Sequence, residues 1–148
     1  MYSYSAPLIE GRILARYKRF FADVQLPSGE TVVAHVPNTG SMKTCWAPGW
    51  RALLSSNDDP KRKLKYTLEL THNGDTWIAV NTGIPNKLVH RALLDGAIPE
   101  LTGYAEILPE QKIGASRIDF LLRDPIQGLC YVEVKNVTLK DEGSPLAL

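Results

Sequence analysis

The stretch RIDFLLRDPIQGLCYVEVK, residues 117–135, predicts two short strands joined by a turn. Side chains alternate between the two faces of a strand, so Asp119 lies opposite the apolar residues that flank it. Residues 123–128 supply the turn, with a proline that fixes φ and a glycine that accepts positive φ. Glu133 and Lys135 share one face of the second strand. If the strands pair, we expect these two side chains to lie beside Asp119.

The acidic face of this hairpin predicts a site for a hard divalent cation. Asp119 and Glu133 offer the carboxylate oxygens that Mg²⁺ prefers as ligands. The ammonium of Lys135 can orient or activate a water, or stabilise charge that develops on a phosphate. This Asp…Glu-x-Lys pattern resembles the metal site of the PD-(D/E)xK nuclease superfamily, which makes all three candidate catalytic residues. The alternative, an amphipathic hairpin with solvated charges and an ordinary ion pair, stays open.

Composition indicates a globular chain of one ordinary domain or two small ones. The 148 residues are 44% hydrophobic and 22% charged. No apolar run reaches the length of a membrane span, and the polar start lacks the apolar segment of a signal peptide, so we expect a cytoplasmic protein. Cys45 and Cys130 have no metal-like spacing, and we expect both to be buried as small hydrophobic residues.

The net charge of +1 is unevenly distributed along the chain. Residues 1–82 carry ten Lys/Arg and seven Asp/Glu, whereas residues 83–148 carry seven and nine. Basic residues therefore gather in the first part, and acidic residues gather around the predicted metal site.

Residues 1–82 predict a small β-barrel. About five short strand-like stretches follow one another at close spacing, with turn residues between them and no long helical pattern. The strongest turn signal is Asn73-Gly74, which lies between two alternating stretches. His35 lies within an apolar strand, and we expect a structural role for it.

The pattern changes near residue 83. Asn86 is a candidate N-cap for a helix of about residues 87–95, and Gly96 is its expected stop. A further strand is expected at about residues 104–108. We therefore place a domain boundary at about 82–86, which gives a barrel at 1–82 and an α/β domain at 83–148.

Several stretches, in this order and spacing, resemble one family across nearly the whole chain. They are RYKRF (16–20), PNTGSM (37–42), NDDPKRK (57–63), YTLEL (66–70), VNT (80–82), PNKLV (85–89), SRIDF (116–120) and YVEVKNVTL (131–139). On these stretches the chain is similar to the bacterial and archaeal sugar fermentation stimulation protein A family, SfsA.

The resemblance implies an N-terminal OB-type barrel followed by a PD-(D/E)xK nuclease-like α/β domain that carries Asp119, Glu133 and Lys135. It also implies DNA binding without sequence preference and a role in regulating sugar (maltose) catabolism. Family members continue beyond Leu148, so the resemblance implies a second domain that is truncated at its C-terminus. The alternative function is a Mg²⁺-dependent DNA nuclease, and no small-molecule cofactor is expected.

Basic residues in the first domain lie among the aromatic residues Tyr17, Phe20, Phe21 and Tyr66. On an OB barrel, cations can neutralise phosphates while flat rings stack on bases, which gives sequence-tolerant binding. In the alternative, the aromatic residues are barrel core and the charges form a solvated rim. The candidate DNA-binding residues are Arg16, Lys18, Arg19, Lys61, Arg62, Lys63 and Lys65.

Overall fold

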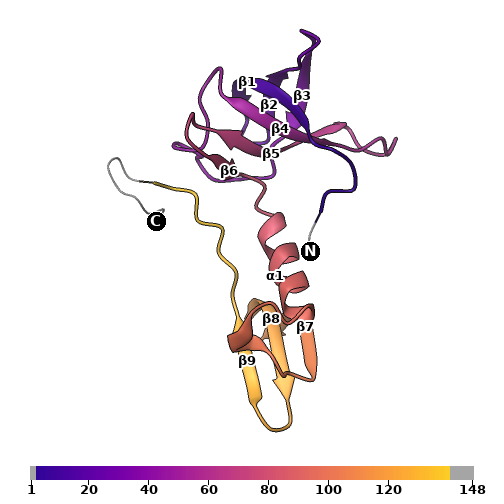
Figure 1. Ribbon diagram of the computed structural model, residues 1–148, viewed down its shortest axis with the longest axis vertical. Helices are drawn as coiled ribbons and strands as arrows, with labels where there is room; N and C mark the ends of the chain where they lie inside the picture. The colour runs from indigo at the N-terminus through magenta and orange to yellow at the C-terminus, as the bar shows by residue number, and fades with distance from the viewer. Residues whose placement is uncertain (1–2, 141–148) are drawn as a thin grey trace. The chain divides into compact units, whose positions relative to one another are not determined.

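The computed structural model describes residues 3–140, which form two compact units (Figure 1). The barrel unit contains residues 4–82 together with 137–140, and the hairpin unit contains Ser3 and residues 83–136. The second domain predicted at 83–148 therefore differs from the hairpin unit, because residues 137–140 lie with the barrel. Within residues 3–140, no helix is both long and apolar enough to cross a membrane.

Five strands of the barrel unit close into a barrel, and a sixth extends it (Figure 1). Neighbouring strands follow the order β3-β2-β1-β4-β5-β6, and a parallel pairing of β3 with β5 closes the ring. All other pairs are antiparallel. The strands are β1 (Ile9–Tyr17), β2 (Phe21–Gln25), β3 (Thr31–His35), β4 (Arg51–Ser56), β5 (Tyr66–His72) and β6 (Trp77–Ala79).

Alternation along these strands fills the barrel. Ala22 and Val24 of β2 are buried, and so are Val32 and Ala34 of β3, while their sequence neighbours are more exposed. Burial of one face of each strand supplies the main driving force for closure. The predicted OB-like barrel is confirmed. Its core also contains Ile13, Val36, Met42, Cys45, Ala52, Leu54, Leu68 and Val80.

Strand β1 is shared between two neighbours, and Gly11 lies where they come closest. Its first residues pair with β4 and its later residues with β2, with a register shift between Ile13 and Ala15. A Cβ atom on Gly11 would lie 2.6 Å from Val24 Cγ1 and 2.8 Å from the Gln25 carbonyl oxygen. The absence of a side chain there permits the close approach of β1 and β2.

The hairpin unit has a mixed α/β arrangement, as predicted, with one α-helix and a three-stranded antiparallel sheet in the order β7-β8-β9. Leu93 from the helix packs with Phe120 and Leu122 of the central strand, and these three side chains are buried. The elements are α1 (Ile84–Leu94), the 3-10 helix η1 (Pro99–Leu101), β7 (Glu106–Ile113), β8 (Ser116–Asp124) and β9 (Gly128–Val132).

The start of α1 differs from the prediction. Gly83 is the N-cap, and Pro85 lies in the first turn, where its fixed φ suits the helix and its missing N–H costs nothing. Asn86 lies inside the helix and caps nothing, so that prediction was wrong. Gly96 does end the helix, with a φ of 63° and its N–H donated to the Leu93 carbonyl.

Residues 137–140 are attached to the barrel through one loop. The Thr138 carbonyl accepts hydrogen bonds from Thr44 Oγ1 (3.4 Å) and from the thiol of Cys45 (3.5 Å). The backbone N–H of Lys140 donates to Thr44 Oγ1 at 3.3 Å. Cys45 is buried in the barrel core, as expected of a small hydrophobic residue.

Candidate functional site

The pairing of β8 with β9 brings Asp119 to the segment after β9 that contains Glu133 and Lys135. The backbone ladder runs from Asp124↔Gly128 to Phe120↔Val132 and ends there. Beyond the last backbone pair, a side chain takes over as the hydrogen-bond acceptor. Asp119 Oδ2 accepts the backbone N–H of Val134 at 2.7 Å. The side chain of Asp119 thereby holds the backbone at Val134, whose neighbours in the sequence are Glu133 and Lys135.

The second oxygen of Asp119 is held from the helix. Asn86 Nδ2 donates to Asp119 Oδ1 at 2.6 Å. Asp119 is half-buried, and it joins α1 to the segment that follows β9. This role of Asn86 was missed from the sequence, because its partner lies 33 residues away and leaves no periodic signal.

Glu133 and Lys135 form an exposed ion pair. Lys135 Nζ lies 2.6 Å from Glu133 Oε1, and their side chains are 72% and 52% exposed respectively. The hydrogen bond to Glu133 raises the pKa of Lys135, and the negative charges of Glu133 and Asp119 raise it further. Lys135 is therefore an ammonium at neutral pH and has no free electron pair with which to accept a proton.

The acidic pair suits a hard cation in its donor chemistry. Asp119 and Glu133 offer only oxygen ligands, and each Asp119 oxygen accepts one protein hydrogen bond and retains a second lone pair. Among residues 3–140, no group of three or more His, Cys, Asp or Glu side chains is arranged to hold a metal ion. A Mg²⁺ site does not require three such side chains, because Mg²⁺ commonly takes one or two carboxylates and keeps waters as its other ligands.

Two candidate DNA-binding residues occupy the tip of the β1–β2 hairpin. Lys18 and Arg19 are exposed and have positive φ values of 49° and 63°. With Phe20 they form a three-residue turn between Tyr17 and Phe21, and its two left-handed residues have a conformation more usual for Gly and Asn. This turn projects two cations at the end of the hairpin.

Arg16 lies beneath this turn, and its guanidinium binds the protein. It donates to the Arg19 carbonyl at 2.9 Å and to three carbonyls of the next loop, those of Asn38 (3.0 Å), Gly40 (2.9 Å) and Ser41 (3.2 Å). Burial lowers the pKa of Arg16, which still leaves it charged. Arg16 thus ties the β1–β2 turn to the loop that follows β3.

The remaining basic candidates lie in the β4–β5 loop. Lys61 and Lys63 are exposed, while Arg62 Nη2 donates to Thr67 Oγ1 at 3.0 Å. Lys65 pairs with Asp58 at 2.8 Å, and this hydrogen bond raises the pKa of Lys65. All four cations of this loop are exposed, and two of them, Arg62 and Lys65, also have protein partners.

The outer face of the barrel carries a row of rings that reaches this loop. Tyr17 pairs with Phe21, Phe21 pairs with His35, and His35 pairs with Thr67 across β1, β2, β3 and β5. His35 therefore lies on the outer face, opposite to the core residues of β3. Tyr66, in contrast, packs against the barrel core.

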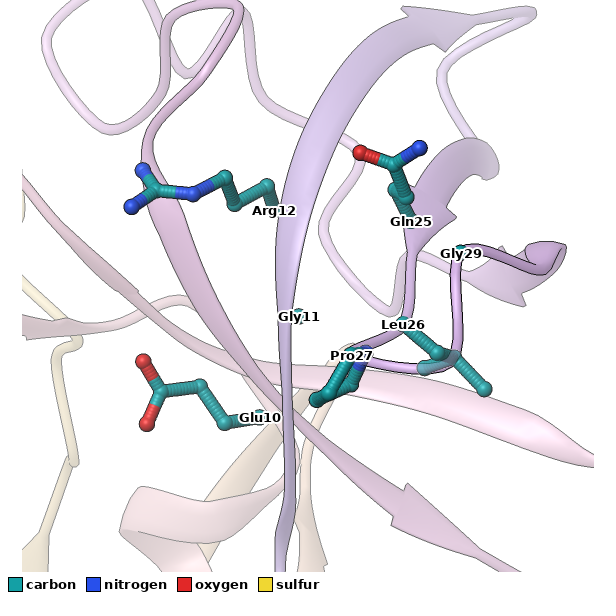
Figure 2. A pocket seen from close by; sticks show the side chains of 7 residues that line it. All are labelled: Glu10, Gly11, Arg12, Gln25, Leu26, Pro27 and Gly29. Atoms are coloured by element: carbon teal, nitrogen blue, oxygen red, sulfur yellow. The ribbon is translucent and has the colours of Figure 1, made fainter.

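A separate pocket of about 430 Å³ lies at the other end of the β1–β2 hairpin. Figure 2 shows Glu10 and Arg12 leaving β1 on one side, with Leu26 and Pro27 on the other. Glu10 pairs with Arg51 at 2.6 Å, and the Arg12 guanidinium donates to the Gly49 carbonyl at 2.9 Å. Both charged groups of this pocket thus already have protein partners.

Family comparison agrees with the two-part architecture. Residues 14–80 match the description "SfsA N-terminal OB domain", and residues 83–148 match "Sugar fermentation stimulation protein RE domain". The chain belongs to the SfsA family. The resemblance seen in the sequence is thereby confirmed along almost its whole length.

SfsA relatives are identical to this chain at about half of the aligned positions. A "Sugar fermentation stimulation protein homolog" from Geotalea uraniireducens (strain Rf4) is 54% identical over 141 residues, which cover 95% of this chain and 61% of that relative. A homolog from Marinomonas sp. (strain MWYL1) is 52% identical and covers 94% and 55%. The chain thus spans less than two thirds of the length of these SfsA relatives.

A solved SfsA structure has the same fold. "The structure of Pyrococcus Furiosus SfsA in complex with Ca2+" matches with a TM-score of 0.80 over 94% of this chain and 58% of that one, at 24% identity. The match supports the OB-like barrel and the α/β arrangement that follows it.

Proposed function

We propose that this SfsA chain binds DNA without sequence preference through its barrel unit. The observation that carries the proposal is the placement of six basic residues in two loops. OB barrels bind oligonucleotides with the β1–β2 and β4–β5 loops and the face of strands 2 and 3. The six are Lys18, Arg19, Lys61, Arg62, Lys63 and Lys65.

Exposed lysines in loops suit contact with phosphates. Such contacts release counterions from the nucleic acid, and they carry no sequence information by themselves. Arg16 is a positioning residue in this proposal, because its guanidinium is occupied by backbone carbonyls. The family name links these proteins to sugar fermentation, and nonspecific DNA binding offers a physical step for regulating sugar (maltose) catabolism.

The test is a titration of labelled DNA by fluorescence anisotropy at several salt concentrations. Replacing Lys61 and Lys63 together by Gln removes two phosphate contacts, so with duplex DNA the slope of log K against log salt becomes less negative by about 1.8. The matched control replaces Lys87 and Lys112 of the hairpin unit, which are also exposed, by Gln. If both double variants keep the original affinity and slope, the β4–β5 loop does not bind DNA.

We propose metal-dependent phosphodiester cleavage as a second candidate, with Mg²⁺ held by Asp119 and Glu133. The supporting observation is the Asp119–Val134 hydrogen bond, which holds the Glu133–Lys135 segment against Asp119. The Pyrococcus relative was solved in complex with Ca²⁺, another cation that takes oxygen ligands. A bound divalent cation supplies Lewis-acid stabilisation and lowers the pKa of water.

The chain's own groups have distinct roles in this candidate. Asp119 and Glu133 would supply the carboxylate oxygens that hold the cation. The raised pKa of Lys135 favours stabilisation of charge on a phosphate, or orientation of water, over removal of a proton. Glu133 must share its carboxylate between Lys135 and the cation, which its second oxygen permits.

Cleavage is tested by incubating single- and double-stranded DNA with Mg²⁺, Mn²⁺ or EDTA. Metal-dependent product that disappears in Lys135→Gln, with DNA binding retained, supports the nuclease. Lys112→Gln is the matched control for loss of one exposed lysine. DNA that is bound but uncut under every condition rejects this candidate and leaves the first proposal standing.

A further inference from the structure

Aromatic side chains of the β1–β2 hairpin lie on the outer face of the barrel and are not part of its core. Tyr17 and Phe20 are 38% and 44% exposed, and Phe21 is half-buried. The inward residues of the same hairpin, Ile13 and Val24, are fully buried. Exposed aromatic groups that gather on one surface commonly mark a binding site.

Three of the rings form a line across neighbouring strands. Tyr17, Phe21 and His35 are directly paired on β1, β2 and β3, so they share one face of the sheet. The Tyr17 and Phe21 rings stack with centroids 5.7 Å apart and planes inclined by 23°. Two rings that stack on one another each keep a second face, on which a further flat group can stack. We call Tyr17, Phe21 and His35 the ring row.

Cations lie at both ends of the ring row. Beside Tyr17, the hairpin turn carries Lys18 and Arg19. Beyond His35, the row continues to Thr67, whose hydroxyl accepts a hydrogen bond from Arg62. The surface therefore has cations at each end and rings between them. A polymer with negative charges and flat groups matches this arrangement.

Asp23 lies beside the ring row on the same face of the sheet and disfavours phosphate there. Asp23 pairs with Val33 next to the ring row, and Tyr17 Oη donates to Asp23 Oδ1 at 3.0 Å. This bond raises the pKa of Tyr17 and holds its ring in place. A carboxylate there repels phosphate, while it can accept an N–H from the edge of a base. Bases therefore fit over the rings, and phosphates fit at the ends.

We propose that the ring row makes this surface a binding site for single-stranded DNA in preference to duplex DNA. The proposal rests on the proposed DNA binding of the barrel unit and assigns its strand preference. In a duplex the base faces are hidden within the stack, so the rings have nothing to stack on. A single strand offers every base face, and stacking does not depend on sequence.

The test compares a labelled oligo-dT with a blunt duplex of mixed sequence, using the full 148-residue chain at one salt concentration. The expected result is tighter binding of the single strand. Tyr17→Leu keeps an apolar side chain and removes the ring, and it is expected to weaken single-strand binding by roughly 10-fold with little change for the duplex. Tyr17→Phe keeps the ring and is expected to retain single-strand binding.

Tyr131→Leu is the matched control, because Tyr131 is an exposed tyrosine on β9 of the hairpin unit, 56% accessible. Equal wild-type affinity for single strand and duplex overturns the strand preference and leaves nonspecific DNA binding intact. An equal loss for both DNAs in Tyr17→Leu also overturns it. Binding of neither DNA by the wild type overturns both proposals. The wild-type comparison decides even if Tyr17→Leu fails to fold.

Discussion

Replacing Asp119 by Ala is expected to loosen the segment that follows β9. Both carboxylate oxygens accept hydrogen bonds, from Asn86 Nδ2 at 2.6 Å and from the Val134 N–H at 2.7 Å. A hydrogen bond to a charged group contributes roughly 1.5–3 kcal/mol. Asp119 is half-buried, so water can replace part of this, and we take the lower value for each bond. The expected loss is about 3 kcal/mol for the hairpin unit.

Amide hydrogen exchange measures this loss at the affected atom. Losing about 1.5 kcal/mol at Val134 corresponds to roughly 10-fold faster exchange of its N–H. Trp46, Trp50 and Trp77 all lie in the barrel unit, so tryptophan fluorescence during urea unfolding reports on the barrel alone. We expect that midpoint to stay unchanged.

Glu133→Ala is the control for the Asp119 prediction. It removes only an exposed ion pair with Lys135, so the exchange rate of the Val134 N–H is expected to stay nearly unchanged. If the Val134 N–H exchanges at the same rate in Asp119→Ala, the Asp119 side chain does not stabilise the backbone after β9. The same reasoning makes Lys135 the better position for testing cleavage, because loss of Asp119 disturbs structure as well as charge.

Three further predictions concern stability. Gly11→Ala introduces a clash between β1 and β2 and is expected to cost about 1–3 kcal/mol, seen as a lower urea midpoint by tryptophan fluorescence. Arg16→Gln leaves backbone carbonyls of two loops without their donor and is expected to cost about 2 kcal/mol, whereas the exposed Lys18→Gln costs less than about 0.5 kcal/mol in the same assay. Backbone N–H groups of its turn hold the pKa of Asp124 below its usual 3.8, so its stabilising effect is present above that pH and is lost as the pH falls. Asp124→Ala should therefore lower the melting temperature more at about pH 7 than at about pH 2.

Periodic patterns predicted the strands well, because burial of one face imposes a repeat of two. Phe120 and Leu122 are buried, and Val132 and Val134 pack against the same core, as the alternation in the predicted hairpin required. The turn predicted from Asn73-Gly74 is also confirmed, since Gly74 has a φ of 104° between β5 and β6. These features depend on near neighbours in the sequence, which a local pattern records.

Side chains with distant partners could not be predicted in this way. Asn86 was expected to cap a helix, yet it binds Asp119, and Arg16 was expected to face DNA, yet it binds carbonyls of the next loop. The strand expected at 104–108 is β7, which runs from Glu106 to Ile113. Its later residues gain their order from pairing with β8, a partner that no local propensity names.

The attachment of residues 137–140 to the barrel has a consequence for the order of synthesis. Thr44 and Cys45 leave the ribosome early, whereas Thr138, which accepts their hydrogen bonds, follows only after the whole hairpin unit. At roughly 5–20 residues per second, the nascent barrel waits several seconds for this last contact. During that interval the loop at Thr44 faces water or a chaperone in place of its final neighbour. The barrel unit thus leaves the ribosome before the hairpin unit but gains its contact with Thr138 only after it.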